Sequence, residues 1–366
     1  MNSFRVQNPW YVDYLPVTAG GLGLARISVS LAILFFLIPG DGLPHYRFLA
    51  DLPPGFYSPA PGPMQLLGQF PPFSFFLILH AVILLSAVAM LAGYRTKTSS
   101  ILCGLAMLLL QGVLFSAGKI DHEIVVPLVP LVMAFSNWGA AWSVDSIRKP
   151  SAAEVQSWPL ALMALLIGFM MFTAGFPKLL GGWLDPTTQA AQSHVLNQFY
   201  GRERQDLLAA FAAGFHSPLL WELLDWGTVL FELLFLVAVF RAAWFRFFLM
   251  LAVLFHTGTM LTMNIAFLPN FLAYSLFLNW SSLHGQIVKR EPQDTGMAGN
   301  KTGRNRIVLY ALLLVMLFVL LRWTGSQFGT GSDLQFHEVV LVTASAFYVL
   351  ITSAASVTRY LINRLP

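Results

Sequence analysis

Apolar residues recur along this chain in long stretches that predict helices crossing a membrane. A helix needs roughly 20 apolar residues to cross about 30 Å of hydrocarbon, and runs close to that length follow one another over most of the sequence. The seventh and eighth are almost fused through NIAFLPN, so that either can be short or re-entrant. We expect ten spans, or nine if these two form one, at 17–39, 73–93, 99–115, 123–137, 158–177, 219–240, 244–263, 265–281, 306–323 and 338–355.

The composition supports this picture and leaves little of the chain for a soluble domain. Of the 366 residues, 57% are hydrophobic and 10% are charged, and the mean hydropathy is +0.67, which is outside the range of ordinary soluble domains. We therefore predict an all-α, polytopic bundle of transmembrane helices. It has a core of about eight spans over residues 1–285, a polar cytoplasmic linker at 286–305 and a C-terminal helix pair at 306–366.

The positive charges predict which side of the membrane each loop faces. With the N-terminus in the cytoplasm, fourteen of the 21 lysines and arginines fall in cytoplasmic segments, as the positive-inside rule requires. Both termini are then cytoplasmic, and the long loops 40–72 and 178–218 lie outside, where they can cover a site. We predict an integral protein of the bacterial cytoplasmic membrane, surrounded by lipid, with its site facing outside. No basic run is interleaved with aromatic residues, so nucleic acid is not an expected partner.

Charged residues inside the predicted spans are candidates for function, because each costs about 2.5–3.5 kcal/mol in hydrocarbon. Glu222, Asp225 and Glu232 lie at positions i, i+3 and i+10 of the sixth span, which places them on one side of a helix facing the bundle interior. Arg26 in the first span is a candidate counter-ion. Two interpretations are open: a structural network of buried ion pairs, or a direct role in chemistry.

Three histidines occupy different kinds of position in the predicted topology, two within spans and one in a turn. His80 and His256 lie near the middle of their spans, where a hydrogen-bonded core imidazole is the simpler interpretation. His122 stands with Lys119 and Asp121 in the turn FSAGKIDHEIVVPL, where the fourth predicted helix begins. The positive end of a helix favours a neutral imidazole there, and the alternative is a solvated interfacial turn. No H-x-x-x-H or H-E-x-x-H spacing occurs, so we expect no metal.

The stretch TAGFPKLLGGWLDP puts a lone lysine, Lys178, at the outer end of a span without charges. Snorkelling to the interface is one explanation of such a lysine. The other is catalytic, since Pro177 interrupts the helix just before it, and Gly181 and Gly182 allow a sharp turn and close approach. A lysine in a desolvated pocket can lose several units from its usual pKa of about 10.4 and act as a base.

Three motifs follow one another along this topology. The first, FTAGFPKLLGGWLD, contains the pattern A-G-x-x-K-L leading to a tryptophan. The second, GKIDHEIVVPLVPLVMAFSNWG at 118–139, joins a histidine-bearing loop to a helix. The third, FHTGTMLTMNIAFLPNFLAYSLFLNW at 255–280, joins an F-H pair to a helix that contains isoleucine and phenylalanine. In this order they resemble the vitamin K-dependent gamma-glutamyl carboxylase family and its bacterial relatives, the HTTM membrane proteins. The resemblance runs from the first predicted span to the eighth.

The resemblance implies a site and a cofactor. Lys178 matches the lysine that deprotonates a reduced naphthoquinone, His122 the histidine that assists at the substrate carbanion, and His256 the histidine of the F-H pair. The implied cofactor is a reduced isoprenoid quinone of the menaquinol or vitamin K hydroquinone type, whose reaction with oxygen gives a strong base for the carboxylation of glutamate. We expect these three residues around one outward-facing pocket. Further candidates for this substrate or quinone pocket are Trp183, Asp121 and Lys119.

One departure from the animal carboxylase changes the expected substrate. Only TGSQFGTGSDLQFHE connects the last two predicted spans, in place of the large lumenal domain that recognises a propeptide. A secreted peptide or a small molecule is then the expected substrate, carboxylated or modified in a related way. Two alternatives stay open: a non-catalytic membrane partner in the maturation of a secreted peptide, and an ion-coupled transporter with Glu232, Asp225 and Arg26 as its relay.

Overall fold

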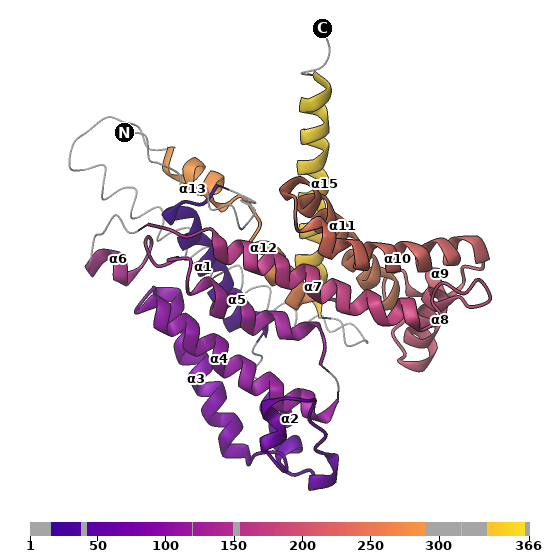
Figure 1. Ribbon diagram of the computed structural model, residues 1–366, viewed down its shortest axis with the longest axis horizontal. Coiled ribbons are helices and arrows are strands. Elements are labelled where there is room, and N and C mark those ends of the chain that lie inside the picture. Colours follow the sequence, from indigo (N-terminus) through magenta and orange to yellow (C-terminus); the bar gives the residue numbers. More distant parts are fainter. Residues whose placement is uncertain are drawn as a thin grey trace. The chain divides into compact units, whose positions relative to one another are not determined.

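The computed structural model describes residues 16–37, 42–118, 120–148, 154–289, 316 and 335–362. All regular secondary structure within these ranges is helical, which confirms the all-α prediction (Figure 1). The predicted span at 306–323 lies outside the described residues except for position 316. Lys119 and most of the predicted linker also lie outside them.

Within the part of the chain that the structure describes, five helices are long and apolar enough to cross a membrane, and each coincides with a predicted span. They identify the chain as an integral membrane protein. A sixth helix, α10 (Pro218–Ala238), has a similar length but carries three carboxylates. The five are α1 (Ala19–Ala32) with its π-helical continuation Ile33–Leu37, α3 (Phe73–Ala92), α4 (Thr96–Leu114) with a 3-10 turn at Phe115–Ala117, α7 (Trp158–Leu180) and α11 (Ala242–Met263).

Two predicted spans are shorter in the structure than their hydrophobicity suggested. The span expected at 123–137 is a 3-10 turn, His122–Ile124, followed by α5 (Val125–Met133); the chain then turns, and Asn137 adopts a positive φ of 61°. The span expected at 265–281 is divided into α12 (Leu268–Ser275) and α13 (Trp280–Lys289). The last predicted span is covered by α15 (Phe336–Ile362).

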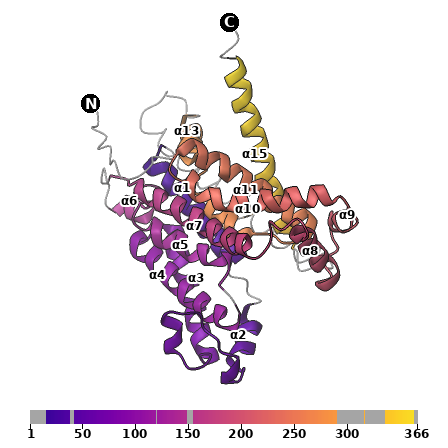
Figure 2. The same cartoon turned by 45° about the vertical axis from the view of Figure 1, so that its right-hand side comes forward.

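The chain packs as two compact units, one of residues 1–166 with 272–319 and the other of residues 167–271 with 320–366. In the first unit, a tight turn after α3 makes α3 and α4 neighbours, and α5 packs on α4 (Figures 1 and 2). The N-terminal helix α1 packs against α3 and α13. The short α2 (Gly42–Ala50) packs on α3 through the stacked rings of Tyr46 and Phe76, whose centroids are 5.3 Å apart.

Arg26 stabilises the predicted cytoplasmic corner of this unit. Gly93 ends α3 with a positive φ of 67°, and a side chain there would collide with the Arg26 guanidinium, so glycine is needed for both reasons. Arg26 donates a hydrogen bond to the carbonyl of Trp142. Asp145 accepts hydrogen bonds from the two backbone amides at the start of α4, at 2.9 and 2.7 Å. Burial works to raise the pKa of Asp145, but these bonds and the charge of Arg26 hold that pKa below its usual value.

In the second unit, α10 packs beside α11, and α11 also packs against α15. The loop between α7 and α10 is called the outer loop because the charge pattern predicts it outside the membrane. It folds into α8 (Ala190–Leu196) and α9 (Ala209–Ala213), which pack on each other and on α11. Asn264 ends α11 with a positive φ of 52°. Its side-chain amide exchanges two hydrogen bonds with the backbone of Asp206, at 2.8 and 3.0 Å, and so ties the loop to the end of the helix.

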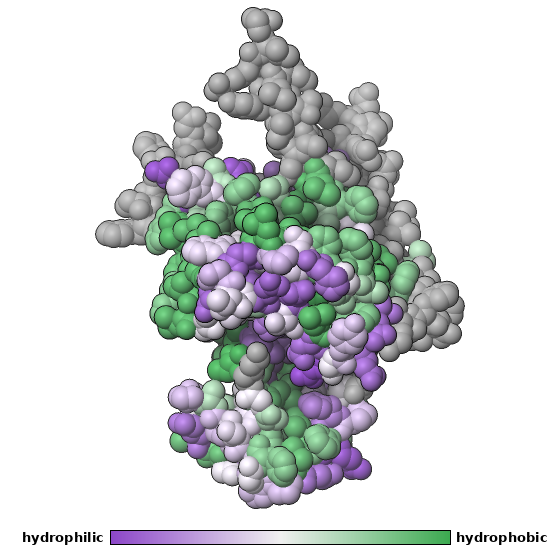
Figure 3. Space-filling view, turned by 90° about the vertical axis from the view of Figure 1, so that its right-hand side faces the viewer, coloured by the Kyte–Doolittle hydropathy of each residue, from purple (hydrophilic) through white to green (hydrophobic). Residues whose placement is uncertain are grey.

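Large apolar side chains stay exposed along the long helices, as expected where a surface faces lipid tails and not water. Leu85 of α3 is 72% exposed and Leu223 of α10 is 60% exposed. Figure 3 shows hydrophobic residues over much of the face that it draws, interrupted by hydrophilic patches. The buried face of α10, by contrast, carries Asp225 and Glu232.

Candidate site at the C-terminal end of α7

Glycines of α7 decide where Lys178 meets α10. Gly168 and Gly175 are two helical turns apart and therefore face the same direction. A Cβ atom on Gly175 would lie 2.7 Å from the Cβ of Glu232, and one on Gly168 would lie 2.6 Å from the side chain of Val239. The two helices can approach this closely only because both positions lack a side chain. Lys178 follows Gly175 by one turn and is thereby brought to Glu232.

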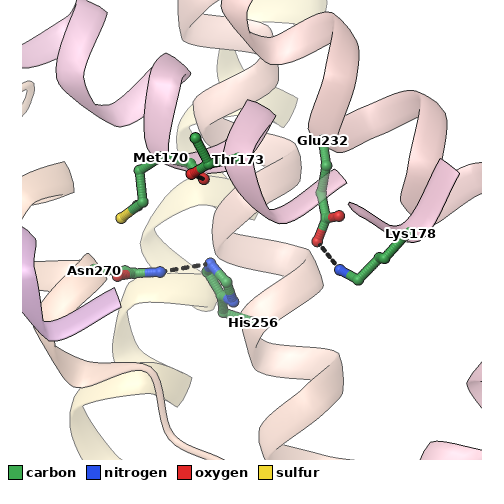
Figure 4. A network of polar contacts seen from close by, with 6 residues as sticks. All are labelled: Met170, Thr173, Lys178, Glu232, His256 and Asn270. Carbon is green, nitrogen blue, oxygen red and sulfur yellow. Dashed lines mark hydrogen bonds and ion pairs between the residues drawn. The ribbon is translucent and has the colours of Figure 1, made fainter. Parts of the chain in front are cut away.

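Lys178 and Glu232 form an ion pair in which Nζ donates a hydrogen bond to Oε1 (Figure 4). The side chain of Lys178 is 24% exposed and that of Glu232 is 5% exposed, so the carboxylate is buried and the ammonium can be reached. The other carboxylate oxygen, Oε2, is buried and has no hydrogen-bond partner among the residues that the structure describes. Nζ also lies 5.0 Å from the centroid of the Trp183 ring, in a cation–π contact.

The three carboxylates of α10 have different surroundings. Asp225 is fully buried and accepts hydrogen bonds from the first two backbone amides of α8, at 3.0 and 2.7 Å, so it fixes the outer loop. Glu222 accepts a hydrogen bond of 2.9 Å from the indole of Trp226 on its own helix. Glu232 is the one of the three that pairs with a lysine.

His256 of α11 lies in the same unit and is 4% exposed. Its Nε2 is 3.1 Å from the side-chain nitrogen of Asn270, as Figure 4 shows beside the lysine pair. With that amide nitrogen as donor, Nε2 accepts, and the proton of a neutral ring lies on Nδ1. The rings of Phe267 and Phe271 pack around the imidazole, with centroids 4.5 and 6.3 Å away. These are the surroundings of a hydrogen-bonded core histidine.

Trp183 connects Lys178 to His194, a residue that belongs to none of the three motifs of the sequence. The Trp183 and His194 rings are 5.3 Å apart between centroids, and His194 lies on α8. The Trp183 ring therefore lies in contact with the Lys178 ammonium and with the His194 ring. The one signal for His194 in the sequence is its place in the long outer loop, because its contact with Trp183 depends on how that loop folds back.

The turn that carries His122 belongs to the first unit, whereas Lys178, Trp183 and His256 belong to the second. Asp121 accepts a 2.9 Å hydrogen bond from the backbone amide of Glu123 and so caps the turn. A common pocket for His122, Lys178 and His256 stays a prediction.

Arg26 and His80, two further candidates from the predicted spans, have contact partners within the first unit. Arg26, expected as a counter-ion for the carboxylates of α10, lies in the first unit with the Trp142 carbonyl and the charge of Asp145 beside it. The counter-ion found for Glu232 is Lys178. His80 lies against Tyr46, with ring centroids 5.9 Å apart.

Comparison with protein families supplies the wider context of this pair. The family model of the HTTM domain matches residues 14–281, well over half of the chain. The chain belongs to the HTTM family. This is the membrane family related to the vitamin K-dependent carboxylase. Searches among curated proteins and among solved structures gave no match.

The HTTM match confirms the resemblance drawn from the three motifs, all of which lie within it. It also contains every residue of the lysine pair and its surroundings: Lys178, Trp183, His194, Glu232, His256 and Asn270. The structure adds the pairing of Lys178 with Glu232, two residues that the sequence marks separately.

Proposed function

We propose that this HTTM protein is a membrane enzyme that uses a reduced isoprenoid quinone at a site facing the outside of the bacterial cytoplasmic membrane. It generates a strong base and modifies, by carboxylation or a related step, a secreted peptide or a small molecule. Lys178 is the base that receives a proton, and His122 is a hydrogen-bonding partner of the substrate. The observation that carries the proposal is the Lys178–Glu232 pair, with a reachable nitrogen and one buried carboxylate oxygen bonded to no described residue.

The surroundings of Lys178 fit the head of a reduced quinone. A buried acceptor that lacks a donor costs about 1–3 kcal/mol, and a hydroxyl that donates to Oε2 of Glu232 removes this cost. The face of Trp183, beside Nζ, offers a surface for a flat aromatic ring. When bound, the reduced quinone supplies the hydroxyl proton and the electrons of the reaction.

Glu232 can convert Lys178 from a cation to a base. The proton of Nζ would pass to Oε1, which already accepts its hydrogen bond, and would leave a neutral amine beside a neutral carboxyl group. The neutral amine would then receive a hydroxyl proton at Nζ, and the low dielectric around the buried carboxylate would strengthen the interaction of Nζ with the group that gives up the proton. Arginine could not take part in these proton transfers, because its guanidinium does not lose a proton in proteins.

Replacement of Lys178 by arginine separates a base from an interfacial anchor. Lys178→Arg keeps a positive, snorkelling side chain, but loss of a general base lowers the rate by about 100-fold or more. The measurement is consumption of reduced quinone by the full chain in proteoliposomes, with thermal unfolding as a check of folding. Lys97→Arg is a matched control, since Lys97 also has its Nζ over an aromatic ring, 4.9 Å from the centroid of Phe135. A stable Lys178→Arg protein that oxidises quinol at the wild-type rate would show that Lys178 is not the base.

A further inference from the structure

We propose that Tyr94, Arg95 and Arg148, here called the arginine cluster, bind the phosphate of an anionic phospholipid at the membrane surface. Tyr94 and Arg95 lie in the turn between α3 and α4, and Arg148 ends the short helix α6 (Val144–Arg148). All three residues belong to the first unit. The cluster is therefore a site apart from the Lys178–Glu232 pair, and the proposal does not depend on the proposed function.

Tyr94 gathers two positive charges on one aromatic ring. The guanidinium carbon of Arg95 lies 5.9 Å from the ring centroid, and that of Arg148 lies 5.1 Å from it. Lys97 lies over a different ring, that of Phe135, and is not counted in the cluster. Both arginines are exposed, and within the described part of the chain neither forms an ion pair with a carboxylate. The ring attracts each cation, but the two cations repel each other, and an anion that contacts both would remove this repulsion.

Backbone hydrogen bonds bring the two arginines together. The amide of Asp145 donates a 3.0 Å hydrogen bond to the carbonyl of Gly93, which fixes the start of α6 to the turn between α3 and α4. The carboxylate of Asp145 accepts hydrogen bonds from the amides of Arg95 and Thr96 and from the Thr96 hydroxyl. The negative charge beside the cluster is thus engaged by the backbone of the turn, which leaves the two guanidinium groups to an external anion.

Arg95 has a backbone conformation that other residues adopt more easily. Its φ is 43°, in the left-handed region, where glycine and asparagine are favoured over residues with longer side chains. The 2.9 Å hydrogen bond from its amide to Asp145 supports this conformation without using the arginine side chain. What arginine adds at this position is therefore its guanidinium group.

The position of the cluster favours a lipid over a soluble anion. Helices α3 and α4 are both long and apolar enough to cross a membrane, so the turn that joins them lies at the membrane surface, at the depth of the lipid headgroups. Tyrosine is typical of this region, and Tyr94 is 39% exposed. Ile147, next to Arg148, is 80% exposed and offers an apolar contact that an acyl chain can use and a soluble phosphate cannot.

The charge of the cluster selects among phospholipids. Phosphatidylcholine carries its own ammonium group beside its phosphate, whereas phosphatidylglycerol has a phosphate without a neighbouring cation. A guanidinium group donates paired hydrogen bonds to phosphate oxygens, and the charges strengthen these bonds. We therefore expect the arginine cluster to prefer phosphatidylglycerol.

Native mass spectrometry of the full chain in detergent, titrated with phosphatidylglycerol or phosphatidylcholine, tests the site. The wild-type protein should bind phosphatidylglycerol more tightly. Arg95→Gln combined with Arg148→Gln should weaken that binding about 25-fold, because each basic residue near an anionic lipid contributes a factor of about five, and should leave the binding of phosphatidylcholine unchanged. Arg148→Gln alone, at the exposed end of α6, should weaken it about five-fold. Thermal unfolding checks that each variant is folded.

Arg241→Gln combined with Arg246→Gln is the matched control. It removes the same charge from two exposed arginines on the same predicted side of the membrane. The guanidinium carbon of Arg241 also lies over an aromatic ring, 5.1 Å from the centroid of Trp244. This variant should bind phosphatidylglycerol as tightly as the wild-type protein. An equal loss in both double variants would mean that total charge, and not the arginine cluster, attracts the lipid, and would overturn the proposal.

Three other results would also overturn it. The first is equal affinity of the wild-type protein for the two phospholipids, and the second is unchanged affinity of folded Arg148→Gln for phosphatidylglycerol. The third is displacement of phosphatidylglycerol by soluble glycerol phosphate at the same concentration, which would identify a site for a soluble anion. Quinol oxidation enters none of these measurements, so the proposed function stands or fails separately.

Discussion

Substituting Gly175 by alanine tests whether the close approach of α7 and α10 holds the lysine pair together. The added methyl group would lie 2.7 Å from the Cβ of Glu232 and 3.2 Å from the backbone nitrogen of Leu233. Neither atom is the free end of a flexible side chain, so one of the helices has to move. That movement separates Lys178 from Glu232.

The size of the effect follows from two opposing contributions. Alanine is favoured over glycine in a helix by about 1 kcal/mol, and overpacking a close contact costs about 1–3 kcal/mol. Gly175→Ala should therefore change the free energy of unfolding by between about 0 and 2 kcal/mol, in the destabilising direction. Gly227 of α10 is a matched control, because a Cβ there meets no described atom within 4 Å. Gly227→Ala should stabilise by up to about 1 kcal/mol, which leaves a difference of about 1–3 kcal/mol between the two variants.

Thermal unfolding in detergent and quinol oxidation in proteoliposomes, measured on both variants, check this reasoning. Gly175→Ala should unfold at a lower temperature than Gly227→Ala and should oxidise quinol more slowly than the wild-type protein. Equal stability of the two variants, with full activity of Gly175→Ala, would refute the claim that glycine at this crossing positions the pair.

Three further predictions concern the Lys178–Glu232 pair, the hydrogen bonds of Asp145 and the membrane topology. In a double-mutant cycle, Glu232→Gln and Lys178→Met should show a coupling of about 0.5–3 kcal/mol in thermal unfolding, as residues in contact do; additive effects would contradict the pairing. Asp145 has a lowered pKa in the folded state, so its contribution to stability is complete above the pKa of the unfolded chain and is lost as the pH falls through the folded pKa. Asp145→Asn should lack this part of the acid dependence of thermal unfolding, and an unchanged profile would argue against the hydrogen bonds described. Tyr200 is 70% exposed in the outer loop, so a cysteine there, with Cys103→Ser, should react with an impermeant thiol reagent in intact cells; reaction only after permeabilisation would reverse the predicted topology.

Much of the fold follows from the sequence, because a membrane helix is determined by its own residues. The backbone of a spanning segment has to satisfy its hydrogen bonds within the helix, so length and hydrophobicity were enough to predict the five long helices. The same reasoning overestimated the span at 265–281. There the chain is mostly apolar, but it leaves the helix after Ser275 and begins α13 at Trp280, whose indole donates a 2.8 Å hydrogen bond to the Ser275 carbonyl.

Single residues of the site were also visible in the sequence, but their partners were not. Lys178 could be selected because a lone charge at the end of a charge-free span and a family motif both mark it. Glu232 was visible as one of three carboxylates on α10, and nothing in their spacing tells which of them meets a lysine 54 positions away. That choice depends on the glycine contacts between α7 and α10, which are a property of two packed helices. The contact of Trp183 with His194 likewise exists only because the outer loop folds back. A helix, in contrast, forms through local interactions and does not depend on how distant segments pack.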